Sequence, residues 1–169
     1  QEPPEQVRGI SATDFEDVVN NITTNGNSCE NFMIPEDLPD NAKWQDSDGT
    51  WHVYISGTGS ASIRGTKDCR DPKNSVRISG SDPVRLYLDG SLKIGADIWI
   101  DTTDINHAAD FMILGTPRST TTRRQNTLQI RGQSPNGDAL KAFIWLPNGR
   151  VRFDISRYRD HLVEGAIWS

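Results

Sequence analysis

The chain has 169 residues, of which 34% are hydrophobic, and a formal net charge of −5. This size predicts one domain. The acidic balance argues against nucleic acid and anionic membranes as the main partners, and no run of about 18 apolar residues occurs that would insert into a membrane.

The first fifty residues predict a polar leader, a short helix and loops, which together form a docked cap on a β domain over residues 51–169. Phe15, Val18, Val19 and Ile22 follow the spacing of one helix face within residues 12–22. Ser11 stands where a helix N-cap is expected. We expect this helix to cover the unpaired edge of the β domain, because an open edge must be covered or paired.

The two cysteines, Cys29 and Cys69, both lie in polar, loop-like surroundings. In an exported protein they would pair and close a loop of about 40 residues, whereas in a cytosolic protein they would be unrelated thiols. Neither has a second Cys or His at ligand spacing. We therefore expect a disulfide and an extracellular or cell-surface location.

The chain from residue 51 onward has the pattern of β-strands. Residues 51–55, 84–88 and 151–155 alternate apolar and polar side chains, so that one face of each strand points to a core. No helical period of useful length follows residue 51.

Glycines recur late in the chain at nearly constant intervals. Gly115, Gly132, Gly149 and Gly165 are 17, 17 and 16 residues apart, and each follows a short apolar run. A regular return of strand and glycine is typical of stacked coils, although evenly spaced hairpins would give the same pattern. The sequence predicts an all-β fold, a parallel β-solenoid (β-helix) with a short N-terminal helix; the alternative is an antiparallel jelly-roll β-sandwich.

No catalytic motif is present, and we expect no enzymatic activity. The chain has no Gly-x-Ser-x-Gly elbow, and its three histidines share no ligand spacing. Cleavage of a glycan ranks below the binding functions. We expect no cofactor; Asp46, Asp48, Asp97 and Asp101 are weak Ca²⁺ candidates whose alternative role is turn formation.

Two groups of side chains are candidates for interaction. Trp99, Trp145 and Trp168 belong to a set of five tryptophans that is large for a thin core; they either fill corners of the core or present exposed contacts. Arg118, Arg123 and Arg124 form a basic stretch that is either a solvated loop or a contact for an acidic glycan or a protein partner.

The second half of the chain, residues 84–169, contains four short motifs at residues 86–91 (LYLDGS), 128–132 (LQIRG), 143–151 (FIWLPNGRV) and 165–168 (GAIW). In these motifs it resembles a C-terminal domain of bacterial type IV pilus assembly and pilin-like surface proteins. The resemblance implies a β-solenoid displayed outside the cell, associated with pili or the envelope and without catalytic residues.

These observations lead to one functional expectation and one alternative. We expect a non-enzymatic, extracellular structural or adhesive module of a bacterial surface appendage, either a filament subunit or a type IV pilus-associated protein. Its partners would be other copies of itself, pilus subunits and, as a further option, glycans. The alternative is a carbohydrate-binding, lectin-like domain. The apolar residues Ile167 and Trp168 suggest an end that a neighbouring copy, the N-terminal segment or further residues would cover.

Overall fold

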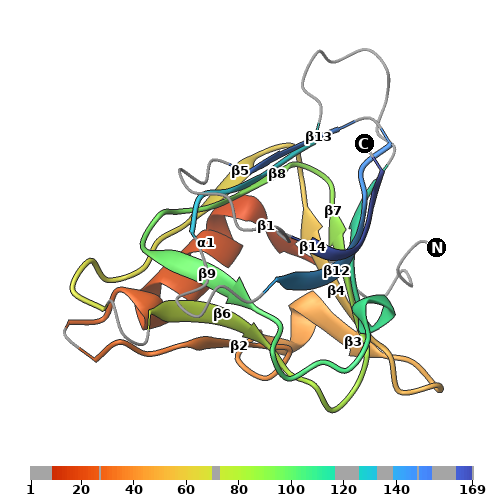
Figure 1. The fold of residues 1–169 in the computed structure, drawn as a ribbon, viewed down its shortest axis with the longest axis horizontal. Helices are drawn as coiled ribbons and strands as arrows, with labels where there is room; N and C mark the ends of the chain where they lie inside the picture. Colours follow the sequence, from red (N-terminus) through yellow and green to blue (C-terminus); the bar gives the residue numbers. More distant parts are fainter. Residues whose placement is uncertain are drawn as a thin grey trace.

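Three sheets of mostly parallel strands surround a single core in the computed structural model of the chain (Figure 1). The structure describes residues 9–26, 28–69, 73–116, 126–132, 139–147, 149–153 and 163–168. Within these residues, the paired strands run parallel except for β3 with β4.

The seven-stranded sheet has the order β1-β4-β7-β10-β12-β14, with β3 also paired to β4. Its strands are β1 (Ile10–Ser11), β3 (Lys43–Gln45), β4 (Trp51–Ser56), β7 (Val84–Leu88), β10 (Phe111–Gly115), β12 (Leu140–Trp145) and β14 (Val163–Trp168). The four-stranded sheet, in the order β13-β11-β8-β5, consists of β5 (Ser60–Ile63), β8 (Ser91–Ile94), β11 (Thr127–Ile130) and β13 (Arg150–Phe153). The three-stranded sheet, in the order β2-β6-β9, consists of β2 (Phe32–Ile34), β6 (Asn74–Ile78) and β9 (Ile98–Asp101). Two short 3-10 helices, η1 (Asp40–Ala42) and η2 (Ala108–Asp110), complete the described elements.

The core is built from columns of inward-facing side chains at matching register positions. In the seven-stranded sheet, Val53, Leu86, Ile113 and Ile144 occupy one such column on β4, β7, β10 and β12, and each is 3% exposed or less. Alternate residues of these strands point outward, as the period of two requires. The strands predicted over residues 51–55 and 84–88 are confirmed as β4 and β7.

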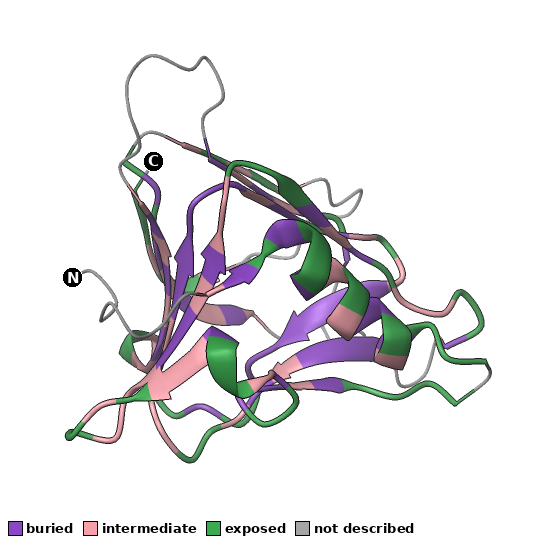
Figure 2. Cartoon of the chain, turned by 180° about the vertical axis from the view of Figure 1, so that it is seen from behind, coloured by how far each residue is buried: buried purple, intermediate pink, exposed green. Residues whose placement is uncertain are grey.

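The predicted N-terminal helix is confirmed as α1 (Ala12–Thr23). The hydroxyl of Ser11 accepts the backbone N–H of Asp14 at 3.1 Å, which is the expected N-cap bond. Phe15 and Val19 face the core and are 2% and 0% exposed. Figure 2 shows α1 in front of the space that the sheets enclose. This twelve-residue helix is too short and too polar to cross a bilayer, and the described chain contains no other helix that would do so.

The predicted fold class is wrong. An all-β solenoid with a coil of about seventeen residues does not describe a chain whose α-helix is part of the core of three separate parallel sheets. Leu86 pairs with Val53, 33 positions earlier, and Ile144 pairs with Ile113, 31 positions earlier. The glycine spacing marks successive strands that enter different sheets: Gly115 ends β10 of the seven-stranded sheet, whereas Gly132 follows β11 of the four-stranded sheet. The antiparallel jelly roll is also wrong, because the strands pair in parallel.

Candidate functional site

The sheets have two different ends, and the end that carries β5 is closed by the helix. Three side chains of α1 bind the free backbone edge of β5. Glu16 Oε1 accepts the N–H of Ser62 at 2.7 Å, and Asn20 donates to the carbonyl of Ser62 at 3.0 Å while accepting the N–H of Arg64 at 2.8 Å. The Thr23 hydroxyl donates to the Arg64 carbonyl at 2.6 Å. These bonds satisfy the groups that a further strand would need, so this edge is blocked against strand addition.

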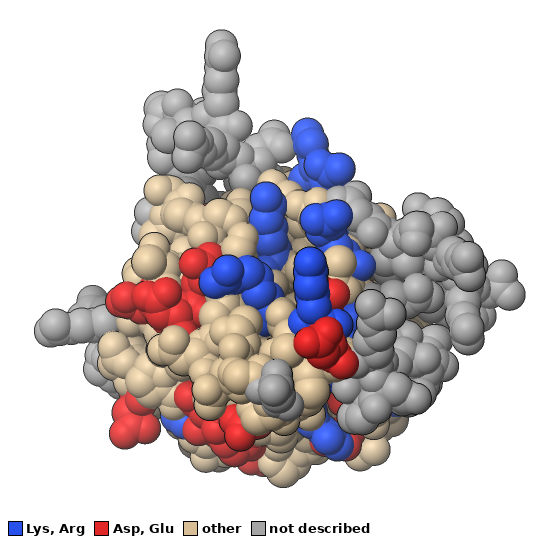
Figure 3. Space-filling model, turned by 90° about the vertical axis from the view of Figure 1, so that its left-hand side faces the viewer, with Lys and Arg blue, Asp and Glu red and all other residues tan. Residues whose placement is uncertain are grey.

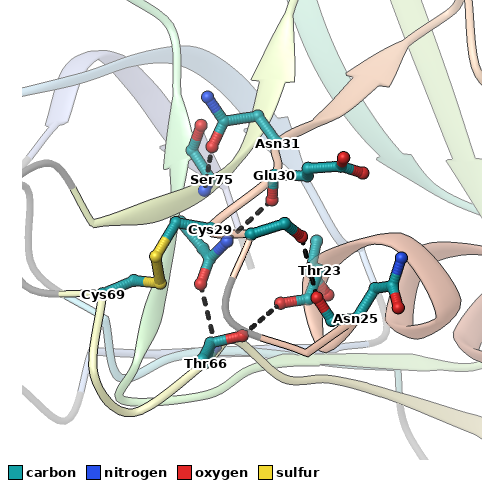
Figure 4. The surroundings of a disulfide bond; sticks show 10 residues. Thr23, Asn25, Cys29, Glu30, Asn31, Thr66, Cys69 and Ser75 are labelled. Carbon is teal, nitrogen blue, oxygen red and sulfur yellow. Dashed lines mark hydrogen bonds between the residues drawn. A yellow bond between two sulfur atoms is a disulfide. The ribbon is translucent and has the colours of Figure 1, made fainter.

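A disulfide fastens the same end. Cys29, which follows α1, is bonded to Cys69, which follows β5, as predicted (Figure 4). Beside it the Thr66 hydroxyl donates to the carbonyl of Thr23 at 2.8 Å, and the buried Asn74 bridges the Thr66 N–H and the Glu30 carbonyl at 2.8 and 2.7 Å. The helix is therefore tied covalently and by hydrogen bonds to the strands that it covers.

The opposite end of the seven-stranded sheet is open. β14 pairs with β12 on one side, and no described strand pairs with its other side. The inward column that holds Ile144 continues to Ile167 on β14, where the exposed fraction rises from 0% to 38%. The inward residues Val151 and Phe153 on β13, the edge of the four-stranded sheet, are also only half-buried. The hydrophobic core thus reaches the surface at this end.

Aromatic side chains extend this apolar surface onto the outer face of the sheet. Trp145 and Trp168 are direct neighbours in register on β12 and β14, and they are 44% and 58% exposed. The rings of Phe143 and Trp168 are stacked, with centroids 6.4 Å apart. Phe143, Trp145 and Trp168 form what we call the aromatic patch. Because most large apolar side chains of the described chain are buried, this group is a candidate contact surface.

A hydrogen-bonded network of Asp46, His52 and Tyr87 lies on the outer face of the same sheet, near its other edge. His52 Nε2 lies 2.8 Å from Asp46 Oδ2, and its Nδ1 lies 2.8 Å from the hydroxyl of Tyr87. The Asp46 carboxylate accepts a hydrogen bond from Nε2 of His52, and this bond holds the pKa of Asp46 below its ordinary value. Burial raises the pKa of Tyr87. His52 and Tyr87 are only 4% and 2% exposed, so most of this network is buried.

Two of the four Ca²⁺ candidates, Asp46 and Asp101, bind backbone groups of the turns in which they lie. Asp46 accepts the N–H groups of Asp48 and Thr50, and Asp101 accepts the N–H and hydroxyl of Thr103. Among the residues that the structure describes, no group of three His, Cys, Asp or Glu side chains is placed to hold a metal ion. Asp97 precedes β9, where its charge opposes the lowering of the Lys73 pKa by burial.

The structure separates the predicted interaction residues. Trp145 and Trp168 lie together in the aromatic patch, whereas Trp99 is 7% exposed in β9. Arg118, Arg123 and Arg124 lie outside the described residues. Sequence reasoning singled out Ile167 with Trp168 as an apolar end, but it missed Phe143, for which the alternation with Trp145 was a usable signal. Only the column of buried neighbours shows that Ile167 continues the core.

No family model, no curated protein and no solved structure matches this chain.

Proposed function

We propose that the chain is a non-enzymatic structural module of a bacterial surface appendage, which joins a neighbouring subunit through the open edge of β14. The observation that carries the proposal is the exposure of Ile167 and Trp168 on an edge strand without a described outer partner. Long apolar edges are rare in proteins that remain monomeric, because they recruit further strands.

The backbone of β14 is suited to strand addition. The carbonyl of Trp168 accepts the N–H of Leu146 at 2.7 Å, so the backbone groups of Trp168 point toward β12. In a strand the backbone groups of the next residue point to the other side. The N–H and carbonyl of Ile167 therefore face outward, where a partner strand would bind them.

The partner that fits best is β14 of a second copy, paired antiparallel about a two-fold axis. At the closed end, α1 occupies the edge of β5, and the edge strands β1, β2 and β3 are only two or three residues long. Short or covered edges resist pairing. A head-to-tail contact would bring β14 against these blocked edges, whereas a two-fold contact pairs two open edges and is closed.

The location outside the cell is part of the same proposal. The Cys29–Cys69 disulfide is consistent with an oxidising compartment, since cytosolic thiols are kept reduced. The motifs between residues 86 and 168 that resemble type IV pilus-associated domains support the choice of a surface appendage.

Sedimentation of Ile167→Pro tests the interface. Proline removes the outward N–H and is tolerated on an edge whose N–H faces solvent. We expect wild type and the control Ile167→Val to form dimers as concentration rises, and Ile167→Pro to remain monomeric with an unchanged far-UV circular dichroism spectrum. A wild-type chain that is monomeric at the highest concentration, or a proline variant that dimerises like wild type, contradicts the interface.

A second function is favoured by the adjacent exposed rings of Trp145 and Trp168. Two aromatic faces on neighbouring strands offer a platform on which sugar rings stack. Glycan-array binding that Trp145→Ala abolishes and Ile167→Pro preserves would support carbohydrate binding in place of self-association. Absence of array binding by wild type would remove this candidate.

A further inference from the structure

The outer face of the four-stranded sheet is positively charged, although the whole chain is acidic. Five exposed basic side chains belong to its strands or directly follow them: Arg64, Lys93, Arg131, Arg150 and Arg152. We call these five residues the basic face. None of the strands β5, β8, β11 and β13 contains an Asp or Glu. Figure 3 shows Lys and Arg side chains gathered on this side of the molecule, with Asp and Glu side chains beside some of them.

The strand register places basic side chains of different strands side by side across the sheet. Lys93, Gln129 and Arg152 are consecutive register partners on β8, β11 and β13. Arg131 extends β11, since its N–H donates to the carbonyl of Ile94 at 2.9 Å. Neighbouring strands lie about 4.8 Å apart, so Lys93 and Arg152 present their charges roughly 10 Å from one another.

Exposed basic side chains are concentrated on this face and are rare elsewhere on the described chain. Among the described residues, the other exposed basic side chain is Lys67; the remaining described Lys and Arg residues are half-buried. Glu16 of α1 lies at the β5 edge of the face, where its carboxylate accepts the N–H of Ser62. A surface on which several exposed cations are gathered attracts an anionic ligand that spans them.

We infer that the basic face binds a linear acidic polysaccharide through its carboxylates. Arginine presents a planar fork that matches a carboxylate with two hydrogen bonds. Ser62 and Thr127 lie on the same outer face, and their hydroxyls offer hydrogen bonds to a sugar. A flat surface with cations on several parallel strands suits an extended chain with regularly spaced negative charges.

The same face is poorly suited to other polyanions. It carries no aromatic side chain in its outward positions, so unpaired nucleobases have nothing on which to stack. It also presents no exposed apolar side chain that would enter the interface of a membrane. A carboxylated polysaccharide needs neither of these features.

Binding of polymannuronate tests the inference, with neutral dextran, single-stranded DNA and anionic phosphatidylglycerol vesicles as competing probes. The test variant is K93E/R131E, and the control K67E/N41D/N106D lowers the net charge by the same four units at exposed positions on other faces. We expect wild type and the control to bind polymannuronate with similar affinity, the test variant to bind about tenfold more weakly, and salt near 0.5 M to abolish binding.

Three outcomes would overturn the inference. They are equal affinity of the test variant and the control for polymannuronate, no binding of polymannuronate by wild type at low salt, and tighter binding of DNA or vesicles than of the polysaccharide. Circular dichroism of both variants establishes that their folds are unchanged. Ile167→Pro separates this surface from β14, because it should bind polymannuronate like wild type.

Discussion

The closed and open ends of the molecule differ in how far the backbone groups of the edge strand are bonded. At β5, backbone N–H and carbonyl groups are bound by Glu16, Asn20 and Thr23 of α1, and the core is sealed by Phe15 and Val19. At β14 the edge has no described outer partner, and Ile167 ends its core column at 38% exposure. The open end is the surface that the proposed function assigns to association with a neighbouring subunit.

The largest difference between the ends should appear when a core aromatic is removed. Phe15→Ala should lower the free energy of unfolding by about 3–5 kcal/mol, because the side chain is fully buried and leaves a cavity. Phe153→Ala, on half-buried β13, should cost only about 1–2 kcal/mol. Urea denaturation at low protein concentration measures both. Equal losses at the two positions would show that the open end is as well packed as the closed one.

Loss of the disulfide should weaken the closed end nearly as much. The variant C29S/C69S should unfold with a free energy about 3–4 kcal/mol lower than wild type, because the bridge spans 40 positions and restricts the unfolded chain. The same comparison on wild type with and without reducing agent should give a matching shift, and dimerisation through β14 should survive in the folded fraction. A loss below about 1 kcal/mol would contradict a stabilising bridge.

Removal of one edge-covering side chain should have a smaller effect. Asn20→Ala leaves the Ser62 carbonyl and the Arg64 N–H without their partners and should cost about 1–3 kcal/mol. Asn21 is the matched control, because it is adjacent on the same helix but exposed. Asn21→Ala should change the stability by less than about 0.5 kcal/mol. Similar free energies of unfolding for the two variants in urea denaturation would rule out that Asn20 stabilises the edge of β5.

The smallest effect concerns acid stability at Asp46. Its pKa lies below the ordinary value of 3.8, chiefly because of the hydrogen bond with His52. Ionised Asp46 therefore contributes stability above the unfolded pKa near 4, and this contribution is lost as the pH falls through the lower folded pKa. The stability difference between wild type and Asp46→Asn should shrink as the pH falls below 4 in urea titrations. A difference that is constant from pH 6 to pH 2 would exclude this role.

Local features of the fold were predictable from the sequence, because they depend on neighbouring residues. The spacing of Phe15 and Val19 identified α1, and Ser11 identified its start. Alternation identified β4 and β7. The polar surroundings of Cys29 and Cys69 favoured the disulfide that the structure contains.

The arrangement of the strands was not predictable from the glycine period. Gly115 ends β10 and Gly132 follows β11, which are consecutive strands in different sheets. Sequence spacing alone does not distinguish consecutive strands from stacked ones. The basic face was missed for a related reason. Arg64, Lys93 and Arg152 are far apart in the chain and meet only through the register of β5, β8 and β13.

Amide hydrogen exchange at increasing protein concentration tests the contrast between the two ends most directly. The amides of Ser62 and Arg64, which α1 covers, should be protected at every concentration, whereas the outward amide of Ile167 should exchange rapidly in dilute solution and become protected as the protein associates. Protection of Ile167 in dilute solution, or its continued rapid exchange at high concentration, would contradict an open edge that serves as the interface.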